Sequence, residues 1–420
     1  MSEQTTGRRF LLLIVAILIV IIAGDTVGVL RMTNNHDFAV YYRAAERLRS
    51  GQDIYAELGA FRTFIESGQS TKDEDTPWPF STPPFHALLT VPLTLLPYSW
   101  AAMIWTGLCL AAMAVACWLL LRSQHWLTLS GLAVTLLLLD QFQPAVVAVR
   151  LGQIDMVIFL LLVLAFIWLK AGAETKAGLA LGMAIGIKVF AGFLVLYLLW
   201  KRRRQAALVA LTSGVVFLIG SFVMVGSQAL KRYLEFSSLY TWGAFAGYPY
   251  HQSLNAFFTR TFKQNIFMSP VANLPWLADG LTIVLSVLLL VGLAWLTRRS
   301  ADAPDAGHSM ADITMPRFDL EYALTVTTML LILPPAPRYA FVWLLLGFLV
   351  VAARLVRGEG PSWLIALLAL SYILSARLVY FPLPLLRRLV MDGQFMLSAL
   401  LLWLALAWLL WKSRQVKGEP

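Results

Sequence analysis

Apolar runs recur from one end of the chain to the other, and this feature constrains the fold more than any other. Clear runs lie at about 10–30, 100–121, 127–149, 153–169, 206–226, 276–297, 320–334, 338–355, 362–376 and 393–411. A helix that spans a bilayer needs about 20 predominantly apolar residues. Because the runs leave no room for a separate soluble domain, we expect residues 1–420 to form one all-α polytopic membrane domain.

The charge content supports a membrane protein. Charged residues make up 13% of the chain, against about 25% in a typical soluble domain. The net charge of +10 comes from short clusters between apolar runs, as the positive-inside rule predicts. We therefore expect a lipid bilayer, and no nucleic acid, as partner. The cysteines, Cys109 and Cys117, lie in one run, a spacing that makes a bond between them geometrically unfavourable.

Two segments decide how many times the chain crosses. The run 84–97 has fourteen residues, too few to span, and it contains prolines, so we expect it to lie at the interface or to enter the bilayer only halfway. The run 177–200 is interrupted by Lys188 and is interpreted as a broken pair of short helices. With these two assignments the basic clusters share the cytoplasmic side. The result is about twelve spans with both termini inside.

This topology puts two large loops on the outer face, at residues 31–99 and 227–275. The first begins with "TNNHDFAVYYRAAERLRSG", which predicts an amphipathic helix with Phe38, Tyr41 and Tyr42 on its apolar side. Gly51 is expected to end that helix. The second loop contains "KRYLEFSSLYTWGAFAGYPYHQSLNAFFTR" and is dense in aromatic residues.

Several polar residues occupy places where an apolar chain would not need them. Asp37 either caps the first-loop helix or serves chemistry beside Tyr41, one helical turn away on the same face. Gln153 and Asp155, in "GQIDMVIF", either start a helix or open onto the same outer face. Lys188 either snorkels from a short helix end or keeps a partner such as a carboxylate or phosphate, since a central lysine costs about 2.5–3.5 kcal/mol on insertion scales.

Two further groups leave the same choice open. "YHQSLNAFFTR" offers His251, Gln252, Ser253 and Arg260, either as an ordinary polar loop or as ligand contacts. "LPPAPRYAF" places Arg338 and Tyr339 at the start of a span, where an interfacial anchor is the simpler interpretation. Together these residues put cations and carboxylates on one side of the membrane. Cations beside a lipid-facing cavity suit a lipid phosphate, and a carboxylate opposite them suits a base that deprotonates a hydroxyl.

Successive segments of the chain resemble glycosyltransferase family 87. They are "DFAVYYRAAERLRSGQDIY", "WPFSTPPFHALLTVPLTLLP", "LGQIDMVIFLLLVLAF", "AGLALGMAIGIKVFAGFLVLYLLWKRRR" and "HQSLNAFFTR". The resemblance runs in order from about residue 31 to 260. It implies the helical GT-C fold, a large first outer loop, and an enzyme of the bacterial cytoplasmic membrane whose site lies on the extracytoplasmic side.

The resemblance also implies the chemistry. Family members take a monosaccharide from a polyprenyl-phosphate donor and pass it, with inversion, to a lipid or glycan acceptor. The position of Asp37 would supply the general base, and those of Lys188 and Arg338 the contact with the donor phosphate. Mannose, another hexose and arabinofuranose all remain open. No cofactor is expected, and no metal is implied because Asp37 has no second carboxylate beside it in the sequence. A metal site that Asp155 completes from another loop remains open.

Two other classes compete with this interpretation. A lipid-linked glycan polymerase or ligase would also use outer-face arginines, but with a long glycan on a pyrophosphate carrier. A transporter or flippase would use Lys188 as a coupling residue, yet transporters commonly show repeated halves with matching broken helices. This chain shows one broken run and a large asymmetric first loop.

Overall fold

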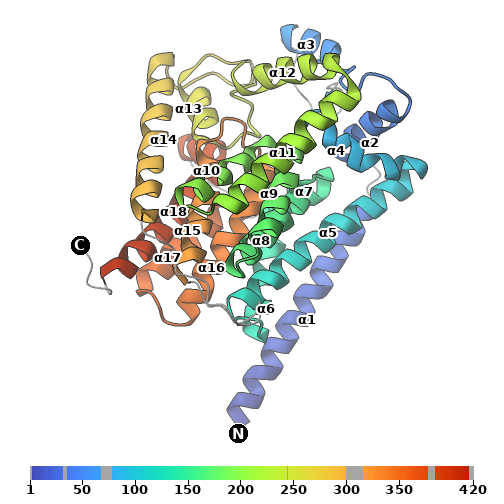
Figure 1. The fold of residues 1–420 in the computed structure, drawn as a ribbon. Helices are drawn as coiled ribbons and strands as arrows, with labels where there is room; N and C mark the ends of the chain where they lie inside the picture. The colour runs from blue at the N-terminus through green and yellow to red at the C-terminus, as the bar shows by residue number, and fades with distance from the viewer. Residues whose placement is uncertain are drawn as a thin grey trace.

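The fold is a bundle of helices, seen in a computed structural model that describes residues 2–31, 36–67, 78–243, 245–298, 316–376 and 384–415 (Figure 1). No strand forms in these ranges. The helices are α1 (Ser2–Arg31), α2 (His36–Arg49), α3 (Leu58–Glu66), α4 (Pro84–Thr90), η1 (Val91–Leu95), α5 (Tyr98–Ser123), α6 (Leu129–Gln141), α7 (Gln143–Leu151), α8 (Asp155–Lys170), α9 (Glu174–Ile187), η2 (Val189–Gly192), α10 (Phe193–Trp200), α11 (Arg204–Val225), α12 (Ser227–Thr241), α13 (Leu254–Phe262), α14 (Pro275–Thr297), α15 (Pro316–Ile332), η3 (Arg338–Trp343), α16 (Leu344–Val356), α17 (Ser362–Leu374) and α18 (Pro384–Gln415).

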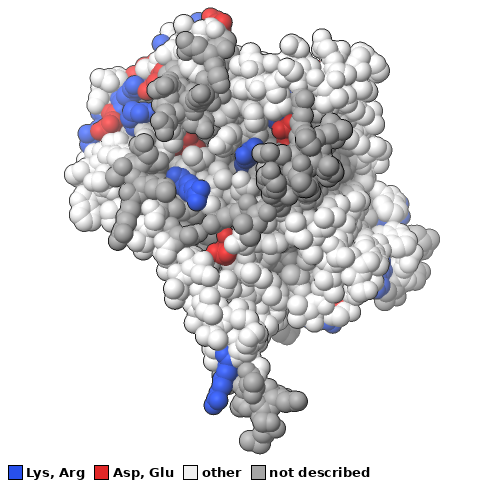
Figure 2. Space-filling model, turned by 180° about the vertical axis from the view of Figure 1, so that it is seen from behind, with Lys and Arg blue, Asp and Glu red and all other residues white. Residues whose placement is uncertain are grey.

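The outside of the bundle is apolar. Within the described ranges, five helices are long and apolar enough to cross a membrane: Tyr98–Ser123, Arg204–Val225, Pro275–Thr297, Arg338–Val356 and Asp392–Gln415. Only 22% of the apolar stretch of α14 is buried, so most of that helix faces outward. Figure 2 shows a largely uncharged surface, with charged side chains gathered mainly toward one end. The all-α prediction is confirmed, whereas about twelve spans and a GT-C arrangement stay predictions.

The breaks in the bundle follow the local sequence. Lys188 has an extended backbone (φ −137°, ψ 112°) between α9 and η2, so the run 177–200 is a broken pair as predicted. The segment 84–97 forms the seven-residue α4 and the short η1, too short to span.

One expected span is wrong as a single helix. The run 127–149 divides at Phe142 into α6 and α7. Pro144 lies in the first turn of α7. It has no N–H to donate to the carbonyl four residues earlier, and its ring clashes with that carbonyl, so a continuous helix is broken there. The amide of Gln143 instead donates to Ser375 O at 2.9 Å.

Helices α2, α3, α4 and α12 lie together at one end of the bundle, which we call the loop end (top of Figure 1). The two large loops meet there through a cluster of buried aromatic and aliphatic side chains. The buried members of this cluster, which we call the roof cluster, are Leu58, Phe61, Phe236, Phe245 and Tyr248. An ion pair between Asp53 and Arg232, at 2.5 Å, also joins the first loop to the second.

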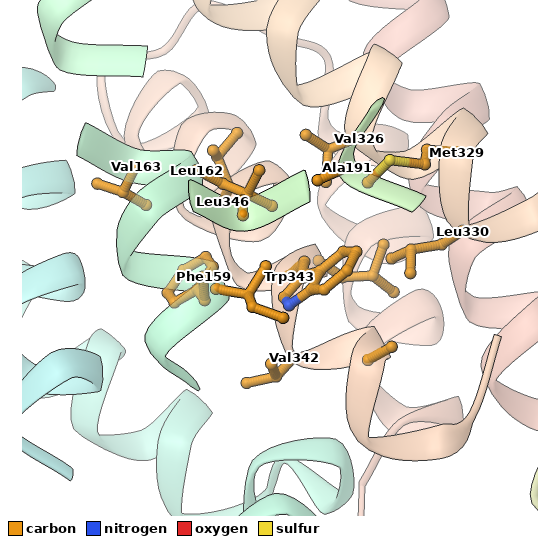
Figure 3. Close-up of a cluster of buried hydrophobic side chains, with 14 of the residues drawn as sticks. Phe159, Leu162, Val163, Ala191, Val326, Met329, Leu330, Val342, Trp343 and Leu346 are labelled. Carbon is orange, nitrogen blue, oxygen red and sulfur yellow. The ribbon is translucent and has the colours of Figure 1, made fainter. Parts of the chain in front are cut away.

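The main core lies under the loop end and holds the helix ends that reach the loop end. Figure 3 shows side chains of α8, η2, α15, η3 and α16 packed around Trp343. Trp343 is 1% exposed, and its indole Nε1 donates to the carbonyl oxygen of Asp155 at 3.1 Å. This contact ties the start of α8 to η3, two elements that reach the site described next.

Candidate active site at the loop end

A cavity of about 160 Å³ opens at the loop end, between the two large loops and the ends of α7 and η3. One water needs a volume of only about 10–15 Å³ measured in this way, so the cavity can hold a larger polar molecule. Its walls are formed by His36, Asp37, Val40, Tyr41, Trp78, Pro79, Ser81, Leu151, Gln153, Phe236, Tyr240, Tyr248, Tyr250, Pro337 and Tyr339. Most of these side chains are aromatic or aliphatic, and the polar ones are few.

Asp37 is the one carboxylate among these wall residues. It lies in the first turn of α2, which begins at His36, and its side chain is 23% exposed. The amide Nε2 of Gln153 donates a hydrogen bond to Oδ2. The other oxygen, Oδ1, is 3.6 Å from Nδ1 of His36. The carboxylate is thus held on one side and faces the cavity on the other.

The turn that carries Gln153 is fixed by its own backbone and by α5. Gly152 adopts a left-handed conformation (φ 69°) that ends α7, and glycine is the preferred residue at such a position. The backbone N–H of Gln153 then donates to Ala148 O at 2.8 Å. From α5, Trp105 Nε1 donates to Gly152 O at 2.7 Å. The amide side chain is therefore presented from a rigid turn.

Tyrosine hydroxyls surround Asp37. Tyr41 donates to Gln153 Oε1 at 2.7 Å, and Tyr240 is hydrogen-bonded to Tyr339. Burial, with the nearby charge of Asp37, raises the pKa of Tyr41 and Tyr240 above the usual value of 10. These hydroxyls therefore stay protonated at neutral pH. The proton of Tyr41 is donated to Gln153, whereas the Tyr240–Tyr339 pair keeps one proton that can be donated to a polar ligand.

Lys188 and Asp155 form a pair behind the cavity wall. Lys188 Nζ is 2.6 Å from Asp155 Oδ2, and the ammonium also lies 4.8 Å from the ring centre of Tyr339. Asp155 is fully buried. Neither residue lines the cavity. Lys188 contacts the ring of Tyr339, which does line it, so the pair lies one side chain away from the cavity.

The second-loop candidates point mainly to backbone carbonyls. Arg260 donates to the oxygens of Tyr248 at 3.0 Å and His251 at 2.8 Å, Gln252 to Asp392 O at 3.1 Å, and Ser253 to Pro334 O at 2.6 Å. These three side chains hold the loop against η3 and α18. Their proposed contact with a substrate stays a prediction.

His251 lies beside this network and is fully buried. Its ring centre is 4.5 Å from that of Tyr240, edge to face. Burial, reinforced by the charge of Arg260, lowers its pKa from 6.5 to about 3. His251 is therefore neutral at pH 7 and supports the cavity from behind Tyr240.

Two other candidates lie outside the wall. Arg338 packs its guanidinium over Tyr250, 4.9 Å from the ring centre, and donates to Pro249 O at 3.3 Å. Tyr42 points away from the cavity, because its hydroxyl donates to Leu96 O at 2.8 Å. The structure thus brings Asp37, Tyr41, Gln153 and Tyr339 together around the cavity.

The main wall residues missing from the sequence-based set are aromatic. Trp78, Phe236, Tyr240, Tyr248 and Tyr250 all line the cavity. The only available signal was the density of aromatic residues in the second loop and the tryptophan of "WPFS". No group of three His, Cys, Asp or Glu side chains suited to a metal occurs in the described residues.

The fold and this site define a class: a helical protein with several apolar, membrane-type helices and a carboxylate-bearing cavity at one end. The family model for glycosyltransferase family 87 matches residues 80–315, more than half of the chain. The chain therefore belongs to glycosyltransferase family 87, and the identification made from its motifs is confirmed.

Relatives with known names agree with this family. The chain is 31% identical over 194 residues to an alpha-(1->3)-arabinofuranosyltransferase of Mycobacterium tuberculosis. It is also 31% identical over 195 residues to a polyprenol-phosphate-mannose-dependent alpha-(1-2)-phosphatidylinositol pentamannoside mannosyltransferase of Mycolicibacterium smegmatis. The matches cover 45% and 44% of this chain and 41% and 44% of the two relatives, less than half the length of each. No solved structure matches significantly.

Proposed function

We propose that this protein transfers a monosaccharide from a polyprenyl-phosphate carrier to a hydroxyl of a lipid or glycan acceptor, with inversion at the anomeric carbon. The observation that carries the proposal is Asp37. It is the one carboxylate in the cavity wall, and its side chain is 23% exposed. The next nearby carboxylate, Asp155, is fully buried and paired with Lys188.

A single accessible carboxylate suits a single displacement. Asp37 takes the proton of the acceptor hydroxyl as that oxygen attacks the anomeric carbon. The bond from this carbon to the phosphate oxygen breaks, and the phosphate leaves with the electron pair. A phosphate is a stable anion and needs no protonation by a second carboxyl group, unlike the alkoxide leaving group in glycoside hydrolysis.

The cavity wall supports a sugar, rather than the phosphate, as its occupant. No lysine or arginine is among the described residues that line it. Aromatic rings offer apolar faces to the C–H side of a sugar, and the hydroxyls of Tyr240 and Tyr339 can bond to sugar oxygens. The phosphate of the donor would then lie at the edge of the cavity.

For the phosphate contact we retain Lys188 and Arg338. Both cations lie directly behind the wall, against the rings of Tyr339 and Tyr250. Both already have partners, Asp155 and Pro249 O respectively. Contact with a donor phosphate therefore requires each cation to exchange or share that partner. The carrier class is suggested by the relative whose name states polyprenol-phosphate-mannose dependence.

The cellular setting is part of the same proposal. The basic clusters predict that the loop end faces the extracytoplasmic side of a bacterial cytoplasmic membrane. Lipid-linked sugar donors are held in the membrane, so the cavity would receive them from the bilayer. We also propose that turnover needs no metal, and addition of a chelator should leave the rate unchanged.

The test is transfer by the purified protein in proteoliposomes. The donors offered are polyprenyl-phosphate mannose and polyprenyl-phosphate arabinofuranose, with a glycolipid extract as acceptor and mass spectrometry of the products. Asp37→Asn should lower turnover by about 10²–10⁴-fold, the usual contribution of a positioned base, without loss of folding. Asp53→Asn, on the same loop but paired with Arg232, serves as the matched control.

Each other outcome has a clear meaning. Wild-type rates with Asp37→Asn would remove Asp37 as the base. Transfer only from a pyrophosphate-linked glycan would favour a polymerase or ligase. Movement of a lipid-linked sugar across the bilayer without a covalent product would favour a transporter.

A further inference from the structure

Gln153 is the side chain that holds the proposed base, and its own orientation is fixed from behind. It is 3% exposed, and both ends of its amide already have protein partners. Nε2 donates to Asp37 and Oε1 accepts from Tyr41 at 2.7 Å. A residue with so little exposed surface and both amide groups engaged is poorly suited to contact a substrate directly.

The direction of this hydrogen-bond chain follows from the chemistry of its members. An ionised carboxylate only accepts hydrogen bonds, so the amide must turn its NH₂ group toward Asp37. The amide oxygen then faces Tyr41, whose hydroxyl must donate. Burial raises the pKa of Tyr41, which keeps that proton in place. The order is therefore from Tyr41 to Gln153 to Asp37.

Tyr41 and Gln153 are themselves held in place by their surroundings. The ring of Tyr41 is buried, with its centre 4.3 Å from that of His86 and 6.3 Å from that of Phe80. The backbone at Gln153 is fixed by the left-handed Gly152 and by the bond from Trp105. A carboxylate held by such a support keeps one rotamer, and with it one oxygen directed toward the cavity.

We propose that Tyr41 and Gln153 are positioning residues, which orient the carboxylate of Asp37 toward the acceptor hydroxyl. This inference rests on the proposed function, in which Asp37 is the base. It assigns to Gln153 and Tyr41 a role that acts through Asp37 and not through substrate binding.

The kinetic test uses matched pairs of variants in the proteoliposome assay, with polyprenyl-phosphate mannose and polyprenyl-phosphate arabinofuranose as donors. Gln153→Met keeps the length of the side chain but removes both hydrogen bonds, and it should lower kcat by about 10²-fold, as loss of alignment typically does, with little change in KM. Its control is Gln124→Met, another buried glutamine bonded to a carboxylate, Asp319, at 2.9 Å.

Tyr41→Phe should lower kcat by about tenfold, because it removes one hydrogen bond and keeps the ring. Its control is Tyr55→Phe, a fully buried tyrosine of the same loop whose hydroxyl donates to Thr82 O at 2.8 Å. A double-mutant cycle then reads the coupling. Tyr41→Phe should have almost no further effect once Gln153 is methionine, and Gln153→Met almost none on the residual rate of Asp37→Asn.

The outcomes separate the inference from the proposed function. If Asp37→Asn keeps the wild-type rate, the proposed function fails. Suppose that Asp37→Asn is inactive but the kcat of Gln153→Met equals that of Gln124→Met, or that the fold-losses of the single variants simply multiply in the double variant. The proposed function then stands and the inference is overturned. A cryo-EM structure of Gln153→Met gives a reading without turnover: we expect the Asp37 carboxylate to leave its wild-type position, and an unchanged carboxylate would overturn the inference.

Discussion

The two ends of the bundle hold the same kinds of side chain but arrange them for different purposes. Helix α8 runs for sixteen residues, from Asp155 at the loop end to Lys170, a rise of about 24 Å. Around Lys170 lies a second group of buried charges, which we call the ionic end. It contains Lys170, Lys201, Arg317, Asp319 and Glu321.

At the ionic end every carboxylate has a cation. Asp319 is 2.9 Å from Lys170 Nζ, and it also accepts from Gln124 Nε2 at 2.9 Å. Glu321 lies between Lys201 at 2.9 Å and Arg317 at 2.8 Å. Such groups join α5, α8, α10 and α15, and their charges are neutralised within the protein.

Asp37 and Asp319 make the contrast specific. Each accepts a hydrogen bond from a buried glutamine, Gln153 or Gln124. Asp319 also forms an ion pair with Lys170. Among the described residues, the basic side chain near Asp37 is His36, whose Nδ1 lies 3.6 Å from Oδ1. A carboxylate with an amide support but no lysine or arginine is oriented and still able to accept a proton, whereas one bound by lysine is committed to structure.

The largest expected effect is on stability, and it follows from a change at Glu321 of the ionic end. Glu321→Gln removes the carboxylate that lies between Lys201 and Arg317, and removal of one partner from a buried pair typically costs about 3–5 kcal/mol. The thermal midpoint of unfolding in detergent should fall sharply, while kcat per folded molecule stays near wild type. Glu359→Gln, whose carboxylate is 39% exposed in its pairs with Arg354 and Arg357, should cost about 0–1 kcal/mol. A sharp loss of kcat without loss of stability would contradict this division of roles.

The second prediction asks which end the Lys188–Asp155 pair belongs to. Asp155→Asn or Lys188→Met alone should destabilise the protein by about 3–5 kcal/mol, because each leaves one buried group without its partner. The double variant should recover a large part of that loss, as replaced buried pairs often do. Thermal midpoints of the four proteins measure the recovery.

The same four proteins sharpen the phosphate assignment. If Lys188 also contacts the donor phosphate, the double variant should be stable but show a raised KM for polyprenyl-phosphate mannose. A stable double variant with wild-type KM would place the pair with the ionic end, as a purely structural element.

The sequence was sufficient for features that depend on local pattern. The period of Phe38, Tyr41 and Tyr42 predicted α2, the lysine in an apolar run predicted the break at Lys188, and length kept 84–97 from spanning. The break at Phe142 was missed although Pro144 signals it, because apolar residues continue on both sides. The continuity of the apolar run outweighed one proline in that interpretation.

Features that depend on contacts between distant segments could not be read in the same way. Asp37 and Gln153 are 116 residues apart in the chain, and no local pattern pairs them. For Lys188 the sequence left a carboxylate or a phosphate as partner, and only the fold brings Asp155 within 2.6 Å. The aromatic wall from Tyr240 to Tyr250 likewise depends on how the second loop folds over the first.

The smallest expected effect concerns pH and the support behind the wall. The pKa of His251 is lowered from 6.5 to about 3 by burial and by Arg260, so between these values the unfolded chain binds a proton that the folded protein does not. The free energy of unfolding that depends on neutral His251 is therefore highest above about pH 6.5, and it decreases as the pH falls toward 3. The thermal midpoint should therefore decline from pH 7 to pH 4.5.

Replacement of this one side chain isolates its part of that decline. His251→Phe keeps a ring against Tyr240 and Tyr248 and removes the titrating group, so its midpoint should decline less steeply over the same range. Equal slopes for His251→Phe and the wild type would show that His251 is solvated in the folded protein, and the wall behind Tyr240 would then be open to water rather than packed.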